Sequence, residues 1–197
     1  MVVDGSVTAT LSIEAIERLH LSVGTIVDDL LSAALARETG IVATYDRALN
    51  LLALRARSAS EMRRALIRKG EPPDQVDAAI ERLLRAGFLD DASFAKQFVR
   101  SRAVGGGLSR RRVQQELRRR GVSPELADAA IQEVFADERV DDSQALERAA
   151  RKKLKTLGRV DEPTRKRRLY AYLARRGYDS HDIGRVINSL ISASDSD

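Results

Sequence analysis

The chain has 197 residues, of which 43% are hydrophobic and 32% are charged, and its formal net charge is +5. This length allows one or two domains with a hydrophobic core. No apolar run approaches the roughly 18 residues of a membrane helix, and the first residues lack a signal-peptide pattern. We therefore expect a soluble, cytoplasmic protein. The chain has no cysteine, which excludes disulfides, thiolate metal sites and cysteine nucleophiles.

Charged residues of opposite sign alternate in blocks along the chain. Residues 1–40 carry a net charge of −4 and residues 122–150 carry −6, whereas residues 91–121 carry +7 and residues 151–177 carry +9. Clusters of this kind favour two cationic surfaces that contact a polyanion or an acidic protein.

The first 42 residues predict a small N-terminal module. Asp4-Gly5 has the composition of a tight turn, and the alternation from Val7 to Leu11 is typical of a strand, so a short β-hairpin is predicted with a stub of a first strand at Val2-Val3. Ser12 then predicts the N-cap of a short helix over 13–19. Gly24 is expected to break this helix, and residues 26–37 predict a second one.

From about residue 45 onward, a helical unit is repeated three times around a glycine that follows basic residues. These glycines lie 51 and 56 residues apart, at Gly70, Gly121 and Gly177. A leucine lies four residues before each glycine and an isoleucine ten residues after it: Leu66, Leu117 and Leu173, then Ile80, Ile131 and Ile187. The matched spacing predicts a helix, a left-handed glycine and another helix in every copy.

Each repeat is predicted to hold three helices. The first helices are expected at 46–56, 91–104 and 142–157 and the second at 60–69, 109–120 and 163–176, with a capping box at Ser58 and Glu61. The third helices should start after residues 72, 123 and 179, with Pro73 and Pro124 in the first turn. The predicted class is all-α, with tandem three-helix repeats in an elongated, curved arrangement.

The predicted domain boundaries follow from these elements. The N-terminal module covers 1–42, and the three repeats cover 43–89, 90–140 and 141–191. The polar residues 192–197 are expected to form a disordered tail.

Basic residues of the second and third repeats are the candidates for partner contact. In the second repeat Arg112 and Arg120 each lie four residues from Glu116, which can neutralise them, whereas four other arginines lack such a neighbour. In the third repeat two lysines belong to a basic run at 151–155. The predicted contact residues are therefore Arg100, Arg102, Arg111, Arg118, Lys152 and Lys153, and the alternative is a solvated helix surface.

The residues predict no catalytic, cofactor or metal site. Asp90-Asp91 and Asp141-Asp142 recur at matched positions, which favours helix capping over paired-acid catalysis. Gly105-Gly106-Gly107 matches neither the Walker nor the dinucleotide pattern and is expected to be a flexible connection between antiparallel helices. Phe94 and Phe98 are expected in the core.

The second repeat resembles the RecX regulatory family. The resemblance is carried by aspartates before Phe94-Ala95, by Arg100-Ser101-Arg102, by the glycine loop, and by the pattern Arg-x-Val-x-x-Glu-Leu-x-x-x-Gly that ends at Gly121. The first repeat resembles the family through Arg68-Lys69-Gly70 and the residues before it, and the third repeat matches less closely.

This resemblance implies a non-enzymatic modulator of the RecA recombinase, with roles in DNA repair, recombination and the SOS response. Such a protein is a monomer without a cofactor. It lodges in the groove of the RecA filament on single-stranded DNA and inhibits the recombinase and co-protease activities, with weak direct DNA binding as a secondary contribution. The alternative is a helical repeat protein that binds nucleic acid directly. The acidic blocks between the basic ones favour a filament partner of mixed charge.

Overall fold

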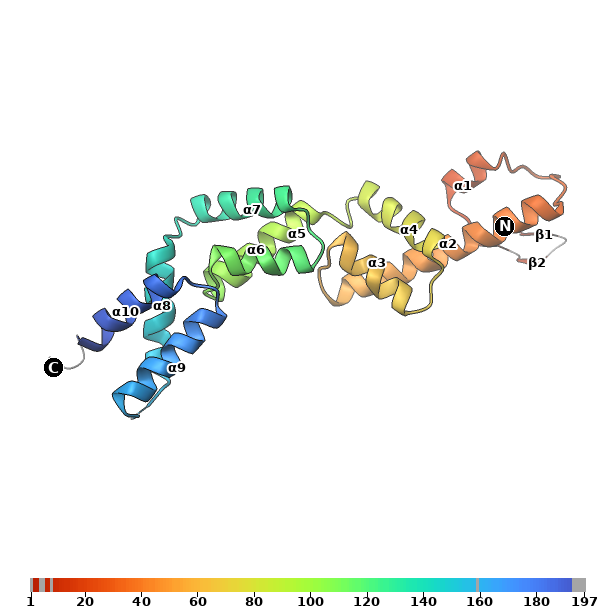
Figure 1. The fold of residues 1–197 in the computed structure, drawn as a ribbon. Helices are drawn as coiled ribbons and strands as arrows, with labels where there is room; N and C mark the ends of the chain where they lie inside the picture. Colours follow the sequence, from red (N-terminus) through yellow and green to blue (C-terminus); the bar gives the residue numbers. More distant parts are fainter. Residues whose placement is uncertain (1, 4–5, 8, 159, 193–197) are drawn as a thin grey trace. The chain divides into compact units, whose positions relative to one another are not determined.

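The structure is a computed structural model that describes residues 2–3, 6–7, 9–158 and 160–192, and most of these residues are helical (Figure 1). The predicted all-α class with tandem three-helix repeats is therefore confirmed. The chain divides into a first unit, Met1–Asp90, and a second unit, Asp91–Asp197. The finer boundaries at 42, 89 and 140, and the elongated, curved arrangement, stay predictions.

Two very short strands begin the first unit. β1 (Val2–Val3) and β2 (Ser6–Val7) pair antiparallel, with Val2 opposite Val7 and Val3 opposite Ser6. The predicted Asp4-Gly5 turn lies outside the described residues, and β2 ends well short of Leu11. The structure therefore does not support the β-hairpin to its predicted extent. Two strands of two residues each are too short to be stable by themselves.

The first helix, α1 (Ile13–Arg18), starts as predicted. The hydroxyl of Ser12 accepts a hydrogen bond from the backbone N–H of Ala15 at 3.2 Å, which is the expected N-cap. The helix ends before Gly24 is reached, because His20 already adopts a left-handed conformation with φ of 50°. The prediction that Gly24 breaks this helix is therefore wrong.

The next two predicted helices, 26–37 and 46–56, are one continuous helix, α2 (Asp29–Leu54). Their separation was a wrong prediction. Asp28 caps the helix by accepting from the N–H of Leu31 at 2.8 Å, and no proline interrupts it. Gly40 alone costs only about 1 kcal/mol in a helix. Buried neighbours such as Ile41 offset that cost by packing.

Two buried carboxylates tie α2 to its neighbours. Glu38, only 2% exposed, pairs with Arg18 of α1 and with Arg82 of α4 (Pro73–Arg85), the latter at 2.8 Å. Glu71, at the turn before α4, accepts from the hydroxyl of Thr44 at 2.9 Å and also pairs with Arg47. Both acids are buried, and each is bound by an arginine and by a second polar partner, so α1 and α4 are held against α2 by directional contacts as well as by apolar packing.

The first repeat consists of the second half of α2, α3 (Ala59–Arg68) and α4. Ser58 caps α3 by accepting from the N–H of Glu61 at 3.1 Å, as predicted. The core of the repeat is a single cluster of buried side chains: Ala48, Met62, Leu66, Val76, Ile80, Leu83 and Leu89.

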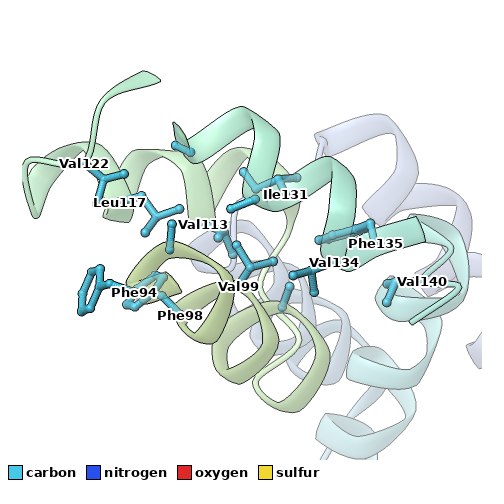
Figure 2. Close-up of a cluster of buried hydrophobic side chains, with 14 of the residues drawn as sticks. Phe94, Phe98, Val99, Val113, Leu117, Val122, Ile131, Val134, Phe135 and Val140 are labelled. Carbon is cyan, nitrogen blue, oxygen red and sulfur yellow. The ribbon is translucent and has the colours of Figure 1, made fainter. Parts of the chain in front are cut away.

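The second repeat consists of α5 (Asp91–Val99), η1 (Arg100–Gly105), α6 (Arg110–Arg119) and α7 (Pro124–Asp137). The predicted helix over 91–104 is thus α5 followed by a π-helix, η1, which the sequence did not predict. Phe94 and Phe98 lie in the core as expected, with their rings stacked at 6.2 Å between centroids. Figure 2 shows them with Val99, Val113 and Leu117 in the cluster between the helices.

The third repeat consists of α8 (Asp142–Leu154), α9 (Glu162–Arg175) and α10 (Ser180–Ser192). Its core is formed by residues such as Leu146, Leu169, Ile183 and Ile187. The predicted tail lies outside the described residues except for Ser192, which ends α10. None of the helices in the described part of the chain combines the length and apolar character needed to cross a membrane.

The three predicted pivots are confirmed. Gly70, Gly121 and Gly177 have φ angles of 88°, 83° and 85°, a conformation in which other residues are strained. The matched leucines, Leu66, Leu117 and Leu173, each have 0% exposure.

Candidate functional site

The orientation of α6 is set by its two buried residues. Val113 and Leu117 lie four residues apart and both have 0% exposure, so they fix the face of the helix that contacts the core. Arg111 and Arg118 are seven residues apart, which places them together on the opposite side, and both are exposed. The structure thus presents two of the predicted contact residues on one helix face.

These two arginines differ in their surroundings. Arg111 forms no ion pair within the described part of the chain. Arg118 lies near Glu125 at the start of α7. The pKa of Glu125 is lowered chiefly by hydrogen bonds from its own backbone N–H and from Ser123, with a smaller contribution from the Arg118 guanidinium. Arg118 therefore has an acidic neighbour on α7, whereas the charge of Arg111 is available to a partner.

The other two arginines predicted to contact a partner, Arg100 and Arg102, lie on η1. Arg100 has no acidic neighbour at helical spacing, but the fold supplies two partners: its guanidinium lies 3.7 Å from the carboxylate of Asp137 and 3.5 Å from that of Glu138. Both acids lie at the far end of α7, so the pairing is invisible at helical spacing. Arg102 is exposed, and its guanidinium carbon lies 5.6 Å from the centroid of the Phe98 ring.

Other arginines of this segment have structural contacts, and two of these arginines contact aromatic rings that the sequence did not reveal as partners. Arg110 lies 4.1 Å from the centroid of Phe135 and pairs with Asp142 at 2.8 Å. Arg120 lies over Phe98 at 4.8 Å. Arg112 pairs with Glu116 at 3.2 Å, as predicted. Stacking of guanidinium groups on aromatic rings covers the edge of the core, so these cations serve the fold first.

In the third repeat the two predicted lysines lie next to each other on α8. Lys152 is exposed and forms no ion pair among the residues that the structure describes. Lys153 is half-buried, with its ammonium nitrogen 5.4 Å from the centroid of the Tyr172 ring. Their neighbour Arg151 is paired with Glu147 at 2.6 Å, one helical turn away. Lys152 is therefore the freer of the two predicted residues.

The acidic pair of the third repeat acts as a cap. The carboxylate of Asp141 accepts from the N–H of Ser143 at 2.7 Å, and α8 begins at Asp142. This is the predicted capping role. Within the described ranges, no three metal-ligating side chains form a group that could hold a metal ion.

Models of one protein family match all three repeats. The model described as "RecX, first three-helix domain" matches residues 45–83, "RecX, second three-helix domain" matches 90–131, and "RecX, third three-helix domain" matches 141–187. The third repeat is therefore matched as well, although its sequence pattern is weaker.

Relatives and solved structures agree with these matches. The regulatory protein RecX of Amycolatopsis mediterranei is 45% identical over 129 residues, which cover 66% of this chain and 72% of the relative. Regulatory protein RecX of Pelodictyon phaeoclathratiforme is 35% identical over 144 residues, 73% of this chain and 86% of the relative.

A crystal structure of regulatory protein RecX has a TM-score of 0.77 at 21% identity, covering 95% of this chain and 92% of that one. RecX from Lactobacillus salivarius has a TM-score of 0.59 at 18% identity, covering 77% and 96%. At these identities the likeness concerns the fold.

Proposed function

Because this chain belongs to the RecX family of regulatory proteins, we propose that it regulates the RecA recombinase by binding the RecA filament on single-stranded DNA and inhibiting it. The observation that carries the proposal is the match of all three repeats to the family. The protein acts by binding rather than by catalysis, without a cofactor, as a cytoplasmic monomer.

The distribution of charge in the second repeat supports a partner that contains protein as well as DNA. Arg111 and Arg118 are exposed on α6, while α7 exposes Glu125 and Asp128. Acidic side chains beside a basic helix repel bare phosphates, whereas a protein surface of mixed charge can complement both signs. A nucleoprotein filament offers protein and phosphate together.

Direct binding to nucleic acid is the second candidate function. It is favoured by Arg111 and Lys152, since neither forms an ion pair within the described ranges and each is exposed. Cations of this kind can contact phosphates of any sequence and release bound counterions.

The two functions differ in how binding depends on salt. Fluorescence anisotropy of a labelled single strand, with and without RecA assembled on it, gives both affinities in one titration series. Each phosphate contact to a single strand adds a slope of about 0.7 to the fall of log K with log salt. We expect weak binding to the bare strand that disappears at moderate salt, and filament binding that persists. Tight, salt-sensitive binding to the bare strand that RecA does not change would establish the second function instead.

A neighbouring pair of residues provides a matched control for the site. Lys152→Ala and Arg151→Ala each remove one positive charge from the same turn of α8, but only Arg151 is already paired, with Glu147. Lys152→Ala should weaken filament binding more than Arg151→Ala. Equal losses would mean that net charge, and not the predicted residue, determines the affinity.

A further inference from the structure

The glycine loop of the second repeat is attached to the pivot of the third. The guanidinium of Arg176 donates to the carbonyl oxygen of Gly106, and the hydroxyl of Tyr178 donates to that of Gly107 at 3.2 Å. In the opposite direction, the backbone N–H of Ser109 donates to the carbonyl oxygen of Arg176 at 3.0 Å. These bonds join residues about 70 positions apart, so the loop is a joint between repeats. The sequence predicted a flexible connection here and did not predict these contacts with the third repeat.

The pivot glycine of the third repeat makes a close contact across this joint. A Cβ atom on Gly177 would lie 2.6 Å from the Cβ of Arg112, in the first turn of α6, and 2.7 Å from the hydroxyl oxygen of Ser109, the N-cap of that helix. At the matched position Gly70, nothing lies within 4 Å of such an atom. Gly70 thus serves the left-handed conformation alone, while Gly177 also lets α6 approach the backbone.

Two contacts hold the guanidinium group of Arg176 in place. Besides its bond to Gly106, the group lies 4.4 Å from the centroid of Tyr172. Its neighbour Arg175 is exposed and makes no comparable contact within the described residues. A second link lies at the start of α6, where Arg110 pairs with Asp142 at the start of α8.

We propose that this joint makes the second and third repeats one binding element, in which Arg176 is a positioning residue. It holds the cations of α6, such as Arg111, at a fixed separation from those of α8, such as Lys152, so that both contact the same partner at once. Contacts that are already ordered before binding lose less entropy when they form, and the second contact becomes intramolecular. The inference rests on the proposed function.

The test compares Arg176→Gln with Arg175→Gln in the full chain. Both variants remove one positive charge from the C-terminal end of the same helix, but only the first removes a hydrogen bond of the joint. Hydrogen exchange of the peptide that contains Leu108 and Ser109 reports the joint directly, and anisotropy with the RecA filament reports binding. Arg176→Gln should accelerate that exchange and lower filament affinity at least about fivefold, whereas Arg175→Gln should leave the exchange unchanged and lower affinity by less than about twofold.

A second pair of variants removes no charge. Gly177→Ala and Gly70→Ala both place a side chain in the left-handed region, so both weaken a helix end to a similar degree. Only Gly177→Ala introduces a clash with α6. It should accelerate exchange at Ser109 and weaken filament binding, while Gly70→Ala should do neither at temperatures where both variants are folded.

Three results would overturn the inference. Unchanged exchange at Ser109 in both Arg176→Gln and Gly177→Ala would show that the joint is not held by these contacts. Accelerated exchange with wild-type affinity would show that the repeats bind independently. Equal losses of affinity in Arg175→Gln and Arg176→Gln would assign the effect to charge. If the wild-type protein does not bind the filament, the proposed function and the binding part of this inference fail together, while the exchange comparison still decides whether the joint exists.

Discussion

Replacing each of the three matched leucines by alanine tests whether the repeats are equivalent. Leu66, Leu117 and Leu173 each have 0% exposure and each lies in the hydrophobic cluster of a different repeat. Truncation of a fully buried leucine removes apolar contacts and leaves a cavity, which costs about 2–5 kcal/mol. We expect about 3 kcal/mol at each position.

The division of the chain into two units makes the prediction more specific. Leu66 belongs to the first unit, whereas Leu117 and Leu173 belong to the second. Leu66→Ala should therefore lower the stability of the first unit, and the other two variants should lower that of the second. With a slope of about 1.5 kcal/mol per M of urea, a loss of about 3 kcal/mol moves the midpoint by about 2 M.

Hydrogen exchange followed by mass spectrometry at increasing urea concentration reports each unit through its own peptides. Leu84→Ala is the matched control, since Leu84 lies on α4 with 45% of its surface exposed and should cost less than about 1 kcal/mol. If one of the matched leucines behaves like Leu84, or if Leu173→Ala leaves the peptides of the second unit unchanged, the equivalence of the repeats is refuted.

Three further predictions concern charge, backbone strain and pH. Reversing Arg102 and Arg111 together should weaken filament inhibition while the helical circular dichroism and the melting transition stay nearly unchanged, because exposed arginines contribute little to folding; a large loss of stability would contradict this. Arg139 has φ of 48°, so Arg139→Gly should raise the free energy of unfolding in urea by about 0.5 kcal/mol, and a lowered midpoint would show that the backbone is not strained there. Burial raises the pKa of Tyr178 from 10.0 to about 12, so the contribution of this neutral phenol to the free energy of unfolding is complete below pH 10 and is lost as the pH rises to 12. Tyr178→Phe should therefore lose less stability between pH 10 and pH 12 than the wild-type protein does. Identical pH profiles of unfolding for the two proteins would contradict this prediction.

The features that the sequence predicted well are those with local causes. Ser12 and Ser58 cap helices because a short hydroxyl side chain reaches the N–H three residues later. Gly121 follows the end of α6 because glycine, unlike residues with a Cβ atom, adopts the left-handed conformation without strain. Caps, pivots and the matched leucines repeat at fixed distances, and the repeat architecture followed from them.

The features that the sequence missed depend on contacts between distant residues. The continuity of α2 reflects packing against α4 and the buried pairs of Glu38, which outweigh the weak helix preference of Gly40. The sequence offered no acidic partner for Arg100, because Asp137 lies on another helix. The same holds for the joint at Gly106, because its donor Arg176 is 70 residues away and the spacing carries no local signal.

The most direct measurement of the central claim is the single-strand-dependent ATPase of RecA from the same organism, titrated with this protein. The account predicts inhibition at substoichiometric ratios, at a salt concentration where binding of this protein to the bare strand is already lost. An ATPase rate that stays constant up to an equimolar ratio, under conditions where the RecA filament is assembled, would contradict it.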